Sequence, residues 1–114
     1  MKILTIAIPS YNSMDYMRNC IESLLPGGED VEILIVDDAQ INRIILCELL
    51  RNQYQILEAE DGKKALEMIK EDKSIDLVLL DIVMPNMDGY QVLEKMKEQR
   101  YLEYLPVIII SSEG

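Results

Sequence analysis

The sequence contains no histidine among its 114 residues, and this absence removes a class of chemistry. Without an imidazole, these residues offer no histidine general base, metal ligand or phosphoryl carrier. Basic residues are also few, because 11 Lys and Arg stand against 21 Asp and Glu, for a formal net charge of -10. Nucleic acids and anionic membranes attract positive charge, so we expect binding to neither.

Cysteine and long apolar runs are equally scarce. The two cysteines, Cys20 and Cys47, fall on apolar stripes of predicted helices, with no secretory segment or regular cysteine spacing beside them. We therefore expect reduced core thiols in a cytoplasmic protein. The longest apolar runs, such as Val107 to Ile110, are much too short to cross a bilayer.

Strand-like and helix-like segments alternate along the chain. Its length predicts one domain over residues 1–114, with a single sheet. Short apolar runs predict strands at 3–8, 31–36, 55–59, 77–80 and 107–110, with helices between them. The helix after the second strand is marked by Ile41, Ile44, Ile45, Leu49 and Leu50. Strands that are apolar throughout are covered on both faces, so we predict an α/β fold with a doubly wound, flavodoxin-like, five-stranded parallel sheet.

Polar side chains stand where several of these strands end. Asp37 and Asp38 follow the second strand, Asp81 follows the fourth, and Ser111 follows the fifth. Each Asp taken alone would be expected to cap the following helix or turn. Carboxylates from different parallel strands converge at one edge of the sheet, however, where they would repel each other without a cation. Oxygen ligands of this kind suit Mg²⁺, so the pattern favours a metal site.

The same segments carry a specific family resemblance. Residues 31–38 (VEILIVDD), 76–89 (DLVLLDIVMPNMDG) and 106–112 (PVIIISS) resemble the first, third and fourth strands of a response-regulator receiver domain. Residues 58–66 (EAEDGKKAL) are similar to the segment after its second strand. The likeness covers about three quarters of the 114 residues, and the pattern from Asp81 to Gly89 is its most specific part.

The resemblance implies a role for each residue at the strand ends. Asp81 would be the phosphoacceptor, while Asp37 and Asp38 would hold Mg²⁺ together with Asp81 and the backbone carbonyl of Val83. Ser111 would be the hydroxyl that turns toward the phosphoryl group. The implied function is a phosphoacceptor module of two-component signalling, supplied by a histidine kinase or phosphotransfer protein. We expect no enzymatic turnover of an external substrate.

The sequence departs from the receiver pattern at both ends. A receiver continues with a helix, a strand bearing Lys-Pro and a last helix, whereas this sequence stops at Gly114. It begins instead with a strand and helix in residues 1–30, and residues 1–38 resemble the start of a family 2 glycosyltransferase. Two alternatives therefore stay open, namely a glycosyltransferase fragment that binds a nucleotide sugar and an engineered chimera without physiological activity.

Whether the leading strand replaces the receiver's missing last strand stays open in the sequence. In a circularly permuted arrangement it would fill the edge beside Val107 to Ile110, with Ile8-Pro9 where the family has Lys-Pro. The missing helix would leave an apolar face exposed near Val107 to Ile110. We therefore expect a homodimer, formed either by exchange of the leading unit or by packing through that face.

Overall fold

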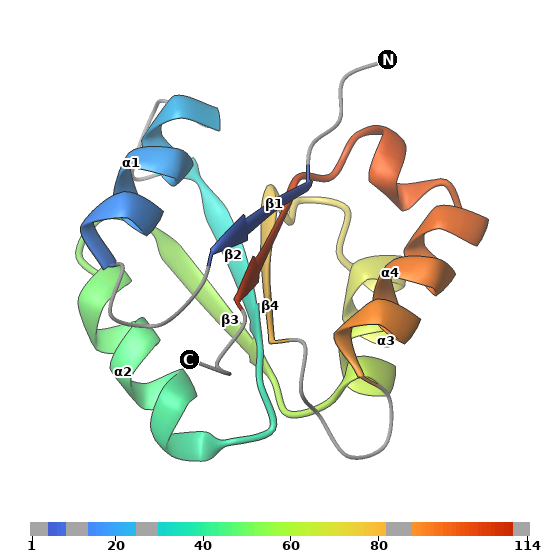
Figure 1. The fold of residues 1–114 in the computed structure, drawn as a ribbon, viewed down its shortest axis with the longest axis horizontal. Coiled ribbons are helices and arrows are strands. Elements are labelled where there is room, and N and C mark those ends of the chain that lie inside the picture. The colour runs from blue at the N-terminus through green and yellow to red at the C-terminus, as the bar shows by residue number, and fades with distance from the viewer. Residues whose placement is uncertain (1–4, 9–13, 25–29, 82–87, 111–114) are drawn as a thin grey trace.

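The computed structural model describes residues 5–8, 14–24, 30–81 and 88–110, in which strands and helices alternate (Figure 1). The strands are β1 (Thr5–Ile8), β2 (Glu32–Val36), β3 (Gln55–Ala59), β4 (Leu77–Asp81) and β5 (Val107–Ile110). The helices are α1 (Met14–Leu24), α2 (Gln40–Leu50), α3 (Gly62–Glu71), α4 (Gly89–Glu98) and the short 3₁₀ helix η2 (Tyr101–Glu103). This order confirms the predicted α/β class; η2 was not among the predicted elements.

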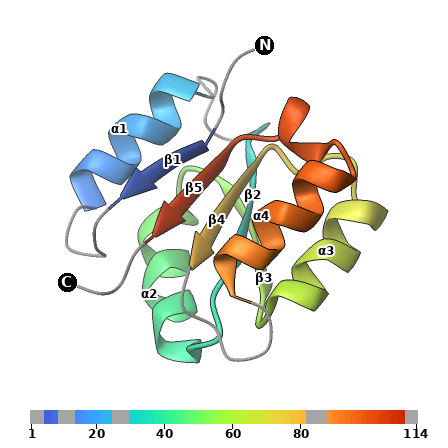
Figure 2. The ribbon, with the colours of Figure 1, turned by 45° about the vertical axis from the view of Figure 1, so that its right-hand side comes forward.

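The five strands form one parallel sheet in the order β1-β5-β4-β2-β3. Strand β1 lies at the edge beside β5, with Thr5 opposite Val107 and Ile8 opposite Ile110. Figure 2 shows these two strands side by side, although they are nearly the full chain length apart in sequence. The leading strand thus lies at the edge beside β5, which answers a question that the sequence left open, and β4 lies at the centre of the sheet.

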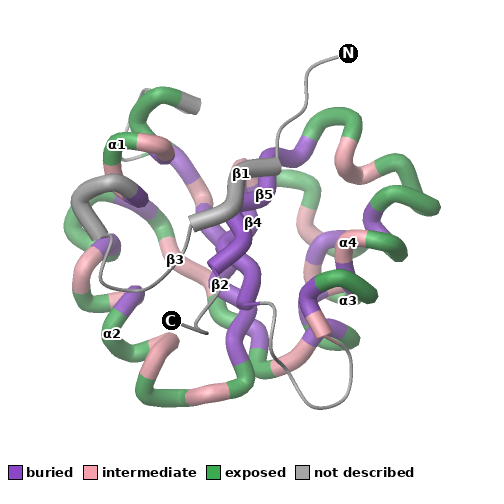
Figure 3. The backbone as a smooth tube through the Cα atoms, viewed as in Figure 1, coloured by how far each residue is buried: buried purple, intermediate pink, exposed green. Residues whose placement is uncertain are grey.

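Two layers of helices cover the sheet, α1 and α2 on one face and α3 and α4 on the other (Figure 1). Successive side chains of a strand point to opposite faces, so each strand contributes to two cores. Leu34 and Val36 of β2 join the core beneath α3 and α4, while Ile33 and Ile35 join the core beneath α1 and α2. All four are at most 1% exposed, and the central strands are buried along their length (Figure 3).

The expected exposed patch on β5 is absent, which corrects one prediction. Residues 107–110 are between 0% and 6% exposed. Val107 and Ile109 pack in the core beneath α4 and η2, whereas Ile108 and Ile110 pack with Met17 of α1. Helix α1 of the leading unit (residues 1–30) thus covers one face of β5, and α4 and η2 cover the other. Packing of a homodimer through this face loses its basis, while exchange of the leading unit stays an untested prediction.

Helix α2 was predicted correctly, but its apolar residues are distributed differently from a simple inward stripe. Leu46 and Leu50 are fully buried, whereas Ile41, Ile44 and Ile45 are 63%, 47% and 45% exposed. The two cysteines are free, as expected, yet both are only half-buried rather than enclosed in the core.

Aspartates cap the N-termini of α3 and α4, the two helices on the other face of the sheet from α1 and α2. Asp61 caps α3 by accepting a hydrogen bond from the amide of Lys64 at 2.8 Å. Asp88 caps α4 through the amide of Gln91, whose side chain accepts in return from the Asp88 amide. These caps satisfy amides that have no partner within the helix, so they fix where α3 and α4 start.

Candidate metal centre

Three aspartates meet at the carboxyl ends of two neighbouring strands. Asp37 directly follows β2, Asp38 comes next, and Asp81 is the last residue of β4. The two strands are paired in register, with Val36 opposite Leu80, so the residues that follow them lie at the same edge. One carboxylate oxygen from each aspartate lies within 4.8 Å of the others. The structure thus brings together the three acids that the sequence placed at the strand ends.

The three carboxylates differ in their exposure to solvent. Asp37 is 1% exposed and Asp81 is 4% exposed, whereas Asp38 is exposed. Buried carboxylates within a few ångströms of each other repel strongly, because the protein interior screens charge poorly. A divalent cation at this point would offset that repulsion, with Asp38 on the side that faces solvent.

The donor set and spacing fit Mg²⁺. This ion takes oxygen ligands at about 2.1 Å in octahedral geometry, so neighbouring ligand oxygens are about 3.0 Å apart and opposite ones about 4.2 Å apart. Three oxygens within 4.8 Å of one another would each need to move by about an ångström to share one ion. Asp37, Asp38 and Asp81 are the described residues that would hold it, and each would supply negative charge.

Backbone contacts hold the turn that carries Asp37. Its amide donates to the carbonyl of Ala59 at 3.2 Å, and its Oδ1 accepts from the amide of Ala39 at 2.9 Å. Ala39 is the N-cap of α2 and makes no side-chain capping bond. Asp37 therefore stabilises the turn, as the capping interpretation required, but that role does not account for the convergence of Asp38 and Asp81.

Arg43 is a further residue at this site that the sequence interpretation missed. Its guanidinium donates to the backbone carbonyl of Asp37 at 2.6 Å, and its Nε lies 3.2 Å from Oε1 of Glu58. The Arg43 side chain is only 13% exposed. It thus ties the start of α2 to the end of β2 and to β3. Its position one turn into α2, after an Asp-Asp pair, was the available signal.

Two of the predicted site residues, Val83 and Ser111, lie outside the described residues. Their roles as a carbonyl ligand and a switch hydroxyl therefore stay predictions. Ser111 directly follows Ile110, which is paired with Asp81 in the register of β4 and β5.

Comparison with known families divides the chain into two overlapping matches. Residues 33–114 match the response regulator receiver domain, and residues 5–45 match glycosyl transferase family 2. The two matches share residues 33–45, which hold most of β2, the Asp-Asp pair and the first half of α2. Strand β1 and helix α1 lie in the glycosyltransferase match alone.

Similar proteins point to the larger match. Two-component response regulator ORR5 of Oryza sativa subsp. japonica is 34% identical over 99 residues, which are 86% of this chain and 74% of that protein. ORR11 of Oryza sativa subsp. indica is 35% identical over 89 residues, which are 77% of this chain. This chain spans 60% of the length of ORR11.

A solved structure agrees with the sequence matches. The N-terminal domain of a response regulator receiver protein from Methanoculleus marisnigri JR1 superposes with a TM-score of 0.63 at 35% identity. The superposition covers 68% of this chain and 63% of that one. No helix of the described residues is long and apolar enough to cross a membrane.

Proposed function

Because the chain belongs to the response regulator receiver domain family, we propose that it is a phosphoacceptor module in which Asp81 receives a phosphoryl group. The observation that carries this proposal is the convergence of Asp37, Asp38 and Asp81 within 4.8 Å at the carboxyl edge of the sheet. Receiver domains bind Mg²⁺ through an acidic pocket of this kind, and the matching relatives are named two-component response regulators.

The chemistry assigns one role to each acid. An oxygen of Asp81 attacks phosphorus, the bond from phosphorus to the donor breaks, and an acyl phosphate forms on Asp81. Bound Mg²⁺ would offset the negative charge of the phosphoryl oxygens in the loose transition state. Asp37 and Asp38, at the end of β2, would help to hold that ion. Arg43 keeps the turn that carries Asp37 in place.

The phosphoryl donor is proposed to be a phosphohistidine on a histidine kinase or phosphotransfer protein. The 114 residues contain no histidine, so the donor side chain does not lie within them. On this proposal the module is no enzyme for other substrates, and any hydrolysis would act on its own acyl phosphate.

Phosphorylation is expected to be slow. The family resemblance puts a Lys-Pro pair on the edge strand, but here Ile8 is the residue of β1 paired with Ile110. An ammonium donor to a phosphoryl oxygen is worth about 1.5–3 kcal/mol. With isoleucine where the family has lysine, that contact is missing from both the product and the transition state.

Intact-mass measurement after incubation with acetyl phosphate and Mg²⁺ tests the proposal. We expect a phosphate-sized increment that disappears in Asp81→Asn and persists in Asp76→Asn, a matched loss of charge at the other end of the strands. An increment that survives Asp81→Asn would show that another residue is the acceptor.

The N-terminal match supports one second candidate, a nucleotide-sugar site derived from a glycosyltransferase. Residues 5–45 carry that match, and β1 and α1 belong to it. Joining of the two families across β2 accounts for the overlap, and we propose it as the origin of the leading unit. Calorimetric titration with UDP-glucose separates the candidates, since measurable binding would favour the second function and its absence the first.

A further inference from the structure

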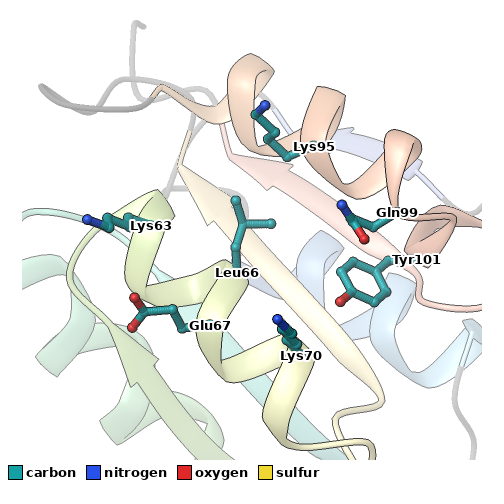
Figure 4. Close-up of a pocket in the computed structure, with 7 residues that line it drawn as sticks. All are labelled: Lys63, Leu66, Glu67, Lys70, Lys95, Gln99 and Tyr101. Atoms are coloured by element: carbon teal, nitrogen blue, oxygen red, sulfur yellow. The ribbon is translucent and has the colours of Figure 1, made fainter.

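A groove between α3 and α4 lies away from the aspartates and has no role in the phosphoacceptor chemistry. Its volume is about 320 Å³. Its lining includes Lys63, Leu66, Glu67 and Lys70 of α3, together with Lys95 of α4 and Tyr101 of η2 (Figure 4). Its walls are two helices that belong to the receiver match, so it is a feature of the larger part of the chain.

The floor of the groove is apolar and held in place from beneath. Leu66 and Tyr101 are half-buried and pack against the core under α3 and α4. The Tyr101 ring meets Tyr104 edge to face at 6.3 Å between centroids, and Lys73 Nζ lies 5.6 Å from the centre of the Tyr101 ring. These contacts fix the aromatic side chain, so an incoming apolar group finds a surface that is already formed.

The rim of the groove is basic in a strongly acidic chain. Lys63, Lys70 and Lys95 are exposed around the floor, and Glu67 is the acidic residue among the lining residues. The groove therefore carries a formal charge of +2 from three lysines and one glutamate, against -10 for the whole chain. Lys95 has an exposed ion pair with Glu98 at 3.6 Å, which costs little to exchange for another partner.

An apolar floor with a positive rim complements one kind of partner. We propose that this groove docks an acidic amphipathic peptide segment of another protein, with an apolar side chain on Leu66 and Tyr101 and carboxylates on the lysines. A helical segment lying along two neighbouring helices is a common form of such recognition. The rim lysines are all exposed, so the groove holds a segment that lies on the surface and does not enclose a small molecule.

Fluorescence anisotropy with a labelled peptide, Ac-EELAEELLAEEL-amide, tests this inference on the full chain. We expect saturable binding that weakens about tenfold in the double variant Lys70→Glu and Lys95→Glu, because each rim contact changes from attraction to repulsion. The matched control is Arg51→Glu with Lys97→Glu, which changes the net charge equally at exposed positions outside the groove lining. The control is expected to bind within about twofold of the unmodified chain.

Four outcomes would overturn the proposal. They are an absence of binding, an equal loss in both double variants, equal binding of the lysine counterpart Ac-KKLAKKLLAKKL-amide, and equal binding of oligothymidine with the same dependence on the rim lysines. Light scattering adds a separate test, since self-association lost only in the groove variant would make a second copy of this chain the occupant. Circular dichroism of each variant confirms that the fold is intact, because all four substituted side chains are exposed.

Discussion

The two ends of the central strands each carry a group of acidic residues, and the groups are built differently. At the carboxyl end, Asp37, Asp38 and Asp81 bring oxygens within 4.8 Å of one another. At the amino end, Glu32 begins β2 and Asp76 immediately precedes β4. There the Glu32 amide donates to Asp76 Oδ2 at 2.9 Å, and the Asp76 amide donates to the Glu32 carbonyl at 2.8 Å.

Ser74 supplies donors to Asp72 and to one oxygen of the Glu32 side chain, the other carboxylates of the amino-end group. The hydroxyl of Ser74 donates to Asp72 Oδ1 at 2.6 Å or to Glu32 Oε2 at 3.1 Å, and the Ser74 amide donates to Asp72 Oδ1 at 2.9 Å. These carboxylates therefore fasten a loop to the sheet. Acidity alone therefore does not distinguish a candidate cation site. Protein donors contact the amino-end carboxylates, whereas oxygens of three carboxylates lie within 4.8 Å of one another at the carboxyl end.

We expect the two acidic groups to differ most in how their variants change the rise in Tm that Mg²⁺ causes. Binding to the folded state alone adds about 1.4 kcal/mol of stability at ten times the dissociation constant and about 2.7 kcal/mol at a hundred times. Thermal melts with and without millimolar Mg²⁺ should therefore show a rise in Tm that is lost in Asp38→Asn and in Asp81→Asn. Glu32→Gln should keep the rise, and a loss in that variant would place the cation at the wrong end of the strands.

In metal-free buffer, replacing an aspartate by asparagine should change the free energy of unfolding in opposite directions at the two ends of the strands. Asp81→Asn removes one of three mutually repelling charges at nearly constant volume, so we expect a gain of about 1 kcal/mol in the free energy of unfolding. Asp76→Asn weakens a charge-assisted hydrogen bond to the Glu32 amide, so we expect a loss of about 0.5–1 kcal/mol. Urea titrations in EDTA measure both; destabilisation by Asp81→Asn would show that repulsion does not dominate at the carboxyl end.

The smallest effect is a pH dependence at the amino end. A hydrogen bond with the Asp72 carboxylate, followed by partial burial, raises the pKa of Glu32 above its ordinary value, because only the protonated Glu32 can donate. Its contribution to stability is thus present below the unfolded pKa and is lost as pH rises through the folded pKa. The pKa of Asp72 is lowered, first by the Ser74 hydroxyl, so its contribution runs oppositely and is lost as pH falls.

Glu32→Gln isolates the first of these contributions by mimicking the protonated acid. At neutral pH we expect the variant to be more stable than the unmodified chain by a few tenths of a kcal/mol, about the size of an exposed charge interaction. The difference in stability between the two proteins should vanish at about pH 3, because Glu32 is then protonated and as uncharged as the glutamine that replaces it. Urea titrations at the two pH values measure it, and a constant difference would rule out titration of Glu32 as the cause.

The acidic site could be predicted from sequence because a parallel sheet gathers its strand ends at one edge. Apolar strands followed by Asp37 or ending at Asp81 therefore sufficed, without knowledge of the packing. The vacancy beside β5 suggested a place for β1, but the sequence left that place open until the pairing with β5 was seen. Neither inference required side-chain detail.

Other features depend on packing that no single segment encodes. Helix α2 has apolar residues on several sides, so periodicity could not tell that Leu46 is buried while Ile41 is exposed. On one face β5 is covered by α4 and η2, which directly precede it in sequence, but on the other face it is covered by α1, which is distant in sequence. The link from Arg43 to the Asp37 carbonyl also needs the turn geometry, because the spacing of Arg43 from the Asp-Asp pair does not reveal that its acceptor is a backbone carbonyl.

The central claim is that the three converging aspartates form a Mg²⁺-dependent phosphoacceptor centred on Asp81. Fluorine NMR of the chain with beryllofluoride, a mimic of the phosphoryl group, tests it most directly. We expect a protein-bound fluoride resonance that requires Mg²⁺, persists in Asp76→Asn and is absent from Asp81→Asn. A bound resonance that forms without Mg²⁺, or that remains in Asp81→Asn, would contradict it.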